Sequence, residues 1–149
     1  MKMENIIQDL NQFLADLAVF YRKLQNYHWN VTGKDFFVIH EKLEEYYDEV
    51  NEAIDKVAEF ILSKDDEPLG TMQDYLNISK IEEAENKKVD SNCVLDSIKQ
   101  DYSYLLNNAY SIKKNADDMQ DYATSTLMDE FISDYTKKLW MIKQTQEKN

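Results

Sequence analysis

The chain of 149 residues has the length of a single domain and can bury a substantial core. Only two glycines and one proline interrupt it, which favours long helices over a sheet with many turns. Its net charge of −12 disfavours DNA binding, because duplex affinity comes from Lys and Arg side chains that neutralise phosphates. One cysteine excludes an intramolecular disulfide framework, and no apolar run reaches signal-peptide or membrane-spanning length. We therefore expect a cytoplasmic protein without membrane contact.

Hydrophobic periodicity predicts two long helices in the first half of the chain, at residues 4–30 and 36–62. The β-branched and glycine residues 31–33 end the first helix, and Asp35 is placed to cap the second with its carboxylate. The first helix has the four-three spacing of a bundle seam, formed by Ile6, Leu10, Phe13, Leu17, Phe20, Leu24 and Tyr27. The predicted core stripe of the second helix consists of Phe36, Leu43, Val50, Ile54, Val57 and Ile61. A separate stripe of polar side chains on that helix indicates a second neighbour: Glu44, Asn51, Asp55 and Glu59.

Residues 63–90 form a connection that is too long for a simple turn between antiparallel helices. Within it we expect a short helix over residues 71–76, with Thr71 as its cap and Asp74 at the third position after the cap. Another helical turn is predicted to open over residues 79–82. The connection is therefore interpreted as a crossover that carries short helices.

Two further long helices are predicted, at residues 91–116 and 122–145, and Cys93 near the start of the first is expected to be buried. The last helix is expected to bury five side chains, Leu127, Phe131, Tyr135, Leu139 and Ile142, with Trp140 on its flank. Four long helices with one long crossover between the second and the third define an all-α, ferritin-like four-helix bundle. We expect residues 1–149 to form this single domain.

Both histidines and three carboxylates lie within one stretch of the chain: His28, His40, Glu44, Asp55 and Glu59. Nitrogen and oxygen ligands of this kind suit a first-row transition metal, iron first among them. His40 and Asp55 are separated by about 22 Å along a helix at ~1.5 Å per residue, so one helix cannot bring them to one ion. An antiparallel, two-fold pair of these helices would join the histidine end of one copy to the carboxylate end of the other. The alternative is a solvated acidic face beside two structural histidines.

Three segments resemble the ferroxidase signature of the Dps family of miniferritins: His28-Trp29-Asn30-Val31, Phe36-Phe37-x-x-His40-Glu41-x-x-Glu44 and Asp55-Lys-Val-Ala-Glu59. The similarity also covers the short helix after Leu69-Gly70-Thr71 and the late Leu139-Trp140-Met141. The resemblance implies that His28 and His40 of one subunit and Asp55 and Glu59 of its two-fold mate bind iron. It places Glu44 where a further acidic ligand or a water-mediated contact occurs.

The same resemblance implies a hollow shell of twelve subunits that oxidises Fe(II), preferentially with hydrogen peroxide rather than oxygen, and stores ferric mineral. Trp29 and Tyr47 are candidate quenchers of stray one-electron oxidation, the alternative for both being plain packing. The acids expected to line a pore through which iron enters are Asp117, Asp118 and Asp121. The alternative for them is a solvated acidic turn, and a further acid of the family's pattern is Thr126 here.

Some members of that family bind DNA through Lys-rich tails, so a nucleoid-compacting protein with little ferroxidase activity is the main alternative. The first predicted helix begins almost at Met1 and only a few residues follow the last, so we expect neither such a tail nor direct DNA binding. An intrasubunit di-iron protein requires Glu-x-x-His pairs, but Gln25 and Phe37 stand three residues before the histidines. A helical interaction protein without chemistry would leave the ligand spacing unexplained.

Overall fold

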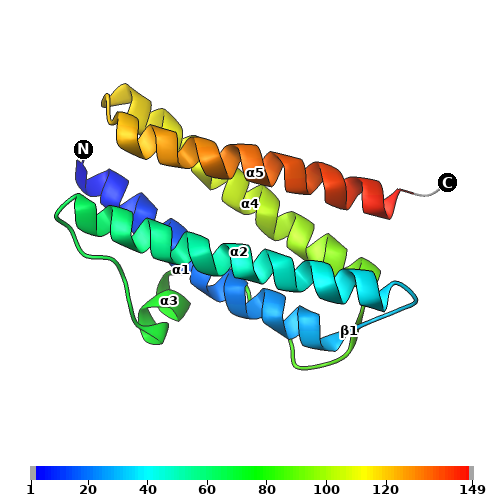
Figure 1. Cartoon of the computed structure of the whole chain (residues 1–149). Helices are drawn as coiled ribbons and strands as arrows, with labels where there is room; N and C mark the ends of the chain where they lie inside the picture. Colours follow the sequence, from blue (N-terminus) through cyan, green and yellow to red (C-terminus); the bar gives the residue numbers. More distant parts are fainter. Residues whose placement is uncertain (1–2, 148–149) are drawn as a thin grey trace. The chain divides into compact units, whose positions relative to one another are not determined.

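The computed structural model describes residues 3–147, which form five helices and two very short strands (Figure 1). Their bounds are α1 Met3–Asn30, β1 Val31–Thr32, α2 Phe36–Ser63, α3 Met72–Ile78, β2 Val89–Asp90, α4 Ser91–Asp118 and α5 Tyr122–Gln146. The four predicted long helices are all present, and their observed ends lie within two residues of the predicted ones. The predicted crossover between the second and third long helices, with a short helix in it, is confirmed.

From Leu10 to Val94 the chain forms one compact unit, in which α1 and α2 run antiparallel and their side chains are in contact (Figure 1). The predicted seam of α1 is buried except for Tyr27, which is half-buried, and α2 buries Leu43, Val50, Val57 and Ile61 as predicted. Phe36 and Ile54, which were also predicted in the core, are only half-buried. For Phe36 the reason is its position in the first turn of α2, where its ring contacts His40 instead of the core.

The turn between α1 and α2 depends on Gly33, whose φ of +136° is a conformation that residues with a Cβ rarely adopt. A Cβ at this position would also lie 3.2 Å from Ser91 Oγ, so a side chain would be crowded there. Asp35 occupies the predicted cap position of α2, but its carboxylate makes no capping hydrogen bond. That part of the prediction is wrong; the contact observed at the start of α2 is from the Phe36 amide, which donates to the Gly33 carbonyl at 3.1 Å in a tight turn.

Strand β1 pairs in parallel with β2, Val31 opposite Val89 and Thr32 opposite Asp90. Hydrophobic periodicity cannot predict strands of two residues, since no alternation develops over that length. Cys93 lies just after β2 and is exposed, so the prediction that it is buried is wrong. Its thiol and backbone bond to Asp90, and together with the Asn92 amide these hydrogen bonds lower the pKa of the Asp90 carboxyl.

Helix α3 begins as predicted, with the Thr71 hydroxyl accepting from the Asp74 amide at 3.1 Å. The further helical turn predicted over residues 79–82 is absent. There the Ser79 hydroxyl and the Lys80 amide donate to Asp16 Oδ1 of α1, at 2.9 and 2.8 Å. The Asp16 carboxylate is fully buried, and it holds this part of the crossover in an extended conformation against α1. Competition from this side-chain acceptor explains why the local helix signal is overridden.

Residues 95–147, with the first residues of α1, form a second compact unit. Helices α4 and α5 are antiparallel neighbours in it: the Tyr102 and Tyr135 rings are 5.2 Å apart and Lys113 pairs with Asp129 at 2.9 Å. Helix α5 buries four of its five predicted core residues, Leu127, Phe131, Tyr135 and Ile142. Leu139 is half-buried, whereas the neighbouring Lys138 is buried and pairs with Asp134 at 2.7 Å.

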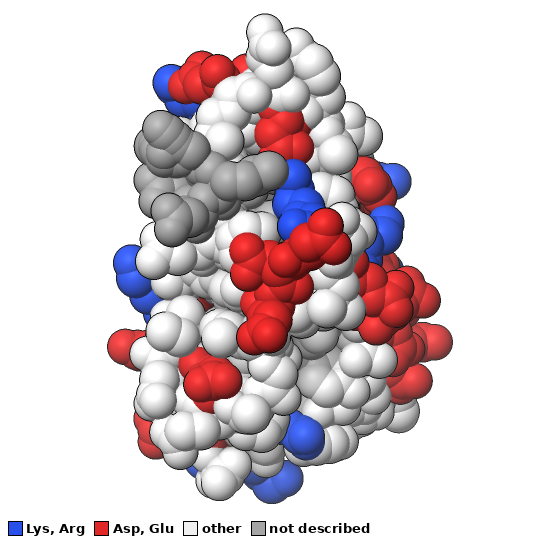
Figure 2. Space-filling model, turned by 90° about the vertical axis from the view of Figure 1, so that its left-hand side faces the viewer, with Lys and Arg blue, Asp and Glu red and all other residues white. Residues whose placement is uncertain are grey.

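The surface of the protein is rich in acidic side chains. On the face drawn in Figure 2, Asp and Glu side chains outnumber Lys and Arg, in keeping with the net charge of −12. In the part of the chain that the structure describes, no helix combines the length and apolarity needed to cross a membrane.

Candidate metal site

The two histidines are brought together where α1 ends and α2 begins. Their imidazole rings stack with centroids 3.7 Å apart and planes inclined by 10°. Each ring also bonds to the backbone of the other residue: His28 Nδ1 lies 2.6 Å from the His40 carbonyl oxygen, and His40 Nδ1 lies 2.7 Å from the His28 carbonyl oxygen. The result is a reciprocal pair of hydrogen bonds that joins the two helices.

These reciprocal bonds assign the ring protons. A carbonyl oxygen can only accept, so Nδ1 of each imidazole must carry the hydrogen and donate it. In the neutral ring the lone pair then lies on Nε2, which is the nitrogen left for a metal ion. A backbone carbonyl is a common partner for the second nitrogen of a metal-binding histidine, because the bond sets the orientation of the ring. Both histidines therefore present Nε2 as a ligand atom.

Two residues of α2 lie beside His28. Glu44 Oε1 is 3.8 Å from His28 Nε2, and the Glu44 side chain is 55% exposed. The Tyr47 ring meets the His28 ring edge to face, with centroids 5.4 Å apart, and Tyr21 contacts Tyr47 in the same manner at 5.9 Å. Desolvation, and then the nearby Glu44 carboxylate, raise the pKa of the Tyr47 phenol.

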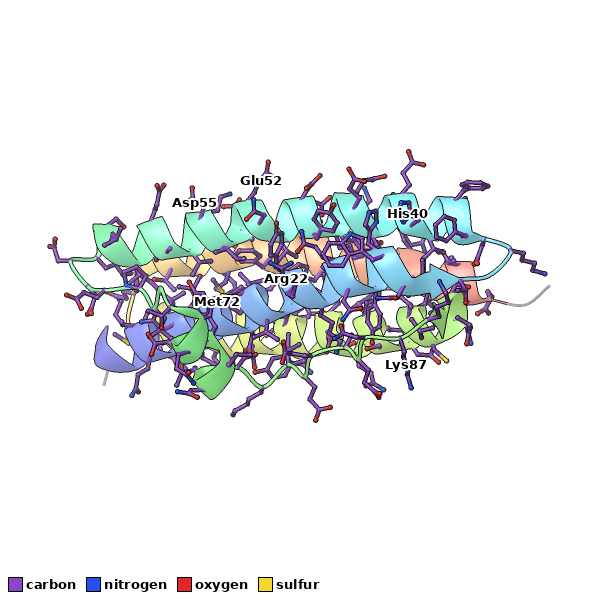
Figure 3. The ribbon with its side chains drawn as sticks, turned by 90° about the horizontal axis from the view of Figure 1, so that it is seen from below. Arg22, His40, Glu52, Asp55, Met72 and Lys87 are labelled. Atoms are coloured by element: carbon purple, nitrogen blue, oxygen red, sulfur yellow. The ribbon has the colours of Figure 1, made fainter. Side chains whose placement is uncertain are left out.

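Asp55 and Glu59 lie elsewhere on α2. They are four residues apart on one exposed face of an uninterrupted helix. Figure 3 shows His40 near one end of α2 and Asp55, with Glu52, toward the other. Because α2 is one helix from Phe36 to Ser63, the rise of ~1.5 Å per residue puts about 22 Å between His40 and Asp55. Among residues 3–147, no three His, Cys, Asp or Glu side chains are placed to hold one ion.

The other candidate residues take up less specific positions. Trp29 follows His28 directly, but its side chain is 58% exposed. Asp117 pairs with Lys113 at 3.7 Å and Asp118 with Lys114 at 3.5 Å, and both acids keep about half or more of their side chain exposed. Asp121 is the cap of α5 and accepts from the Thr124 amide and hydroxyl, at 3.3 and 2.7 Å.

One contact at the histidine pair went unpredicted. Phe36 stacks on His40 with centroids 4.8 Å apart and planes inclined by 20°. The four-residue spacing of Phe36 and His40 places them on one helix face, and this is the signal that could have revealed the pair. The same spacing also suits a core residue, which is why hydrophobic periodicity assigned Phe36 to the core.

Comparison with known proteins gives consistent results over nearly the whole chain. The family of ferritin-like domains matches residues 7–148. DNA protection during starvation protein 2 of Bacillus anthracis is 36% identical over 140 residues, which cover 94% of this chain and 95% of that protein. General stress protein 20U of Bacillus subtilis is 34% identical, over 94% of this chain and 96% of that protein.

Solved structures agree with these sequence relatives. The crystal structure of antigen TpF1 from Treponema pallidum has a TM-score of 0.95 at 34% identity, and the match covers 97% of this chain and 93% of that one. The Dps protein from Bacillus brevis has a TM-score of 0.93 at 33% identity, over 99% of this chain and 100% of that one. The predicted ferritin-like fold is thereby confirmed. The chain belongs to the Dps family of ferritin-like proteins.

Proposed function

We propose that this protein oxidises Fe(II) at sites shared by two subunits and stores the Fe(III) product as mineral inside a hollow shell of its own copies. The observation that carries the proposal is the reciprocal bonding of His28 and His40, which leaves both Nε2 atoms free as ligands. Membership of the ferritin-like family supports iron as the metal. One solved relative, the Dps protein of Vibrio cholerae, is described as a member of a superfamily of ferritin-like diiron-carboxylate proteins.

The second half of each site would come from another subunit. Among the described residues, His28, His40 and Glu44 are not placed so that the three could hold one ion, and Asp55 and Glu59 lie some four turns along α2. An antiparallel pair of α2 helices about a two-fold axis would place each carboxylate pair opposite the partner's histidine pair. Two equivalent sites per dimer follow from this symmetry.

Exposed apolar side chains support the same pairing. Phe37 and Val38 are 82% and 66% exposed at the histidine end of α2, and Leu62 is exposed at its other end. Met72 and Leu76 of the short helix α3 are exposed as well. Exposed apolar groups at both ends of one helix are typical of an interface. An antiparallel partner would cover both ends at once, and we propose that such dimers assemble into a twelve-subunit shell.

The chemistry follows from the ligands. Two Fe(II) ions each lose one electron, and one hydrogen peroxide molecule takes up both electrons and two protons to give two water molecules. A paired transfer of this kind releases no hydroxyl radical, which is why we propose peroxide as the preferred oxidant over oxygen. Carboxylates favour the more highly charged Fe(III) product. Tyr47, in contact with His28, and Trp29, next to it in the chain, are proposed to reduce stray one-electron oxidants.

The acids before α5 are proposed to attract cations at a pore of the shell. Asp117 and Asp118 keep exposed carboxylates, although each has a lysine partner that a cation must displace. The Asp121 carboxylate caps α5, so we propose that it attracts cations less than Asp117 and Asp118 do.

Fe(II) oxidation followed by stopped-flow absorbance tests the proposal, with the mass of the particle measured in solution on the same sample. Wild type is expected to be a shell-sized particle that oxidises Fe(II) faster with peroxide than with oxygen. His28→Ala, which removes a ligand, is expected to slow oxidation at least ~10-fold. Glu83→Ala removes an exposed acid of the crossover and serves as the matched control. A monomeric wild type, or normal oxidation by His28→Ala, would refute the proposal.

A DNA-binding role is the second candidate, because related proteins are named for DNA protection. We propose that any protection by this chain comes from the removal of iron and peroxide, since a surface with a net charge of −12 per subunit repels phosphates. In a gel-shift assay at low salt without divalent metal, the assembled protein is expected to leave duplex DNA unshifted. A strong shift that disappears as salt is raised would contradict this expectation.

A further inference from the structure

We infer that Phe36 is a positioning residue of the metal site, which holds the His40 imidazole in the plane that directs Nε2 at the metal. The inference rests on the proposed function and assigns a role to a side chain that offers no ligand atom. It is carried by the stacking of three rings, Phe36 on His40 and His40 on His28.

The geometry places His40 between the two other rings. The His28 ring is parallel to His40 within 10° at 3.7 Å, and the Phe36 ring is parallel within 20° at 4.8 Å. Two rings at these distances cannot share one face of an imidazole without overlapping each other. His28 and Phe36 therefore cover opposite faces of the His40 ring.

Stacking on both faces restricts the plane of the His40 ring, which its single hydrogen bond cannot fix. The torsion that sets the plane of a histidine ring is broad, so the backbone of α2 alone does not determine it. The bond from Nδ1 to the His28 carbonyl fixes one edge, but the ring can still tilt about that contact. Stacking on both faces restricts the tilt. His28 is also restrained by the edge of Tyr47, whereas His40 has Phe36 in this role.

The position of Phe36 is set by the turn before it. Gly33, at φ +136°, allows the tight turn whose carbonyl accepts from the Phe36 amide at 3.1 Å, so α2 starts at Phe36. His40 is then one turn further along the same face.

Metal coordination withdraws electron density from the imidazole, and an electron-poor ring is attracted to the face of an aromatic ring. Phe36 is thus expected to favour the metal-bound form of His40 over the free form.

The test compares Phe36 with an exposed aromatic residue that has no part in the proposed site or interface, in the assembled protein. Phe36→Leu removes the stacked ring, and Phe36→Tyr retains a ring in the same place. Tyr110→Leu is the control, because it removes an aromatic ring of α4 that is 53% exposed. Co(II) alone serves as the probe, since it binds nitrogen and oxygen ligands and its absorption reports their geometry. The mass of each particle is measured first, so that only assembled shells are compared.

Phe36→Leu is expected to raise the Kd for Co(II) about 3- to 10-fold, the range that corresponds to one aromatic pair. It should raise KM for Fe(II) by a similar factor while changing kcat less than about two-fold. Phe36→Tyr and Tyr110→Leu are expected to bind Co(II) like wild type. Should Phe36→Leu fail to assemble, Phe36→Met replaces it in the same comparison.

Three results would overturn the inference. If Phe36→Leu binds Co(II) with wild-type affinity, the role of Phe36 is refuted but the proposed function is not. If Phe36→Leu and Phe36→Tyr lose Co(II) affinity equally, the site requires the shape of phenylalanine rather than an aromatic face at this position. A wild-type particle that neither binds Co(II) nor oxidises Fe(II) would remove the proposed function, and the role of Phe36 with it.

Discussion

Two inactive variants of this chain are expected to regain Fe(II) oxidation when they are assembled together. The first lacks both imidazoles, through His28→Ala and His40→Ala. The second lacks the carboxylates at the other end of α2, through Asp55→Ala and Glu59→Ala. Each variant alone should oxidise iron no faster than buffer. Shells refolded or co-expressed from equal amounts of the two should recover about one quarter of the wild-type rate.

The expected fraction follows from the two-fold pairing. Half of the dimers in a random mixture contain one chain of each kind. In such a dimer one site combines intact histidines with intact carboxylates, and the other site lacks both sets. A site built within one chain would behave differently, because neither variant would then contain a complete site in any combination. The mixing experiment therefore separates a shared site from an internal one.

The control is a mixture of shells that were assembled separately. These cannot exchange halves of a site as long as the particles remain intact, so they should stay inactive. Mass measurement on tagged chains establishes that the co-assembled particles contain both variants. Particles of mixed composition without any oxidation would contradict the antiparallel pairing of α2, even if the single ligand assignments were correct.

Replacing Asp16 is expected to cause a large loss of stability. Its buried carboxylate accepts from the Ser79 hydroxyl and the Lys80 amide, and Ser79 Oγ in turn accepts from the amide of buried Ile81. Asp16→Ala removes this fully buried acceptor and leaves both donors without it. The free energy of unfolding should fall by about 2–4 kcal/mol, which corresponds to a Tm lower by about 5–15 °C.

Calorimetry at one fixed protein concentration measures this effect, because the stability of an oligomer depends on concentration. Glu83→Ala, an exposed acid in the same crossover, should change the free energy of unfolding by no more than about 0.5 kcal/mol. Ser79→Ala should lower the free energy of unfolding less than Asp16→Ala does. The double variant should lower it by less than the sum of the two single effects. An Asp16→Ala protein as stable as Glu83→Ala would show that the crossover is held by other contacts.

Much of the fold was predictable because long helices carry strong local signals. The four-three spacing of Leu10, Phe13 and Leu17 and the lack of glycine and proline are properties of a few neighbouring residues, and these gave helix ends within two residues. The cap at Thr71 is equally local and is also confirmed. The helix ends near Gly33 were predictable for the same reason, since only a glycine adopts that turn easily.

The predictions that were wrong or missing concern contacts between residues far apart in the chain, or contacts between side chains. The helical turn predicted after Ser79 is absent because Asp16, sixty-three residues earlier, supplies a better acceptor. The pairing of Val31 with Val89 left no trace in periodicity, since two residues cannot alternate. Phe36 had the spacing of a core residue, and its contact with His40 became visible only once both rings were placed.

For the site, residue types and spacing determined the candidate ligands and showed that one helix cannot unite them. A rise of ~1.5 Å per residue separates His40 from Asp55 regardless of how the helix packs. Only the tertiary structure decided that the imidazoles stack, that each Nδ1 donates to the other residue's carbonyl, and that Nε2 is the atom left for a metal. Ring orientation depends on contacts between the end of α1 and the start of α2, and a one-dimensional pattern contains no information about them.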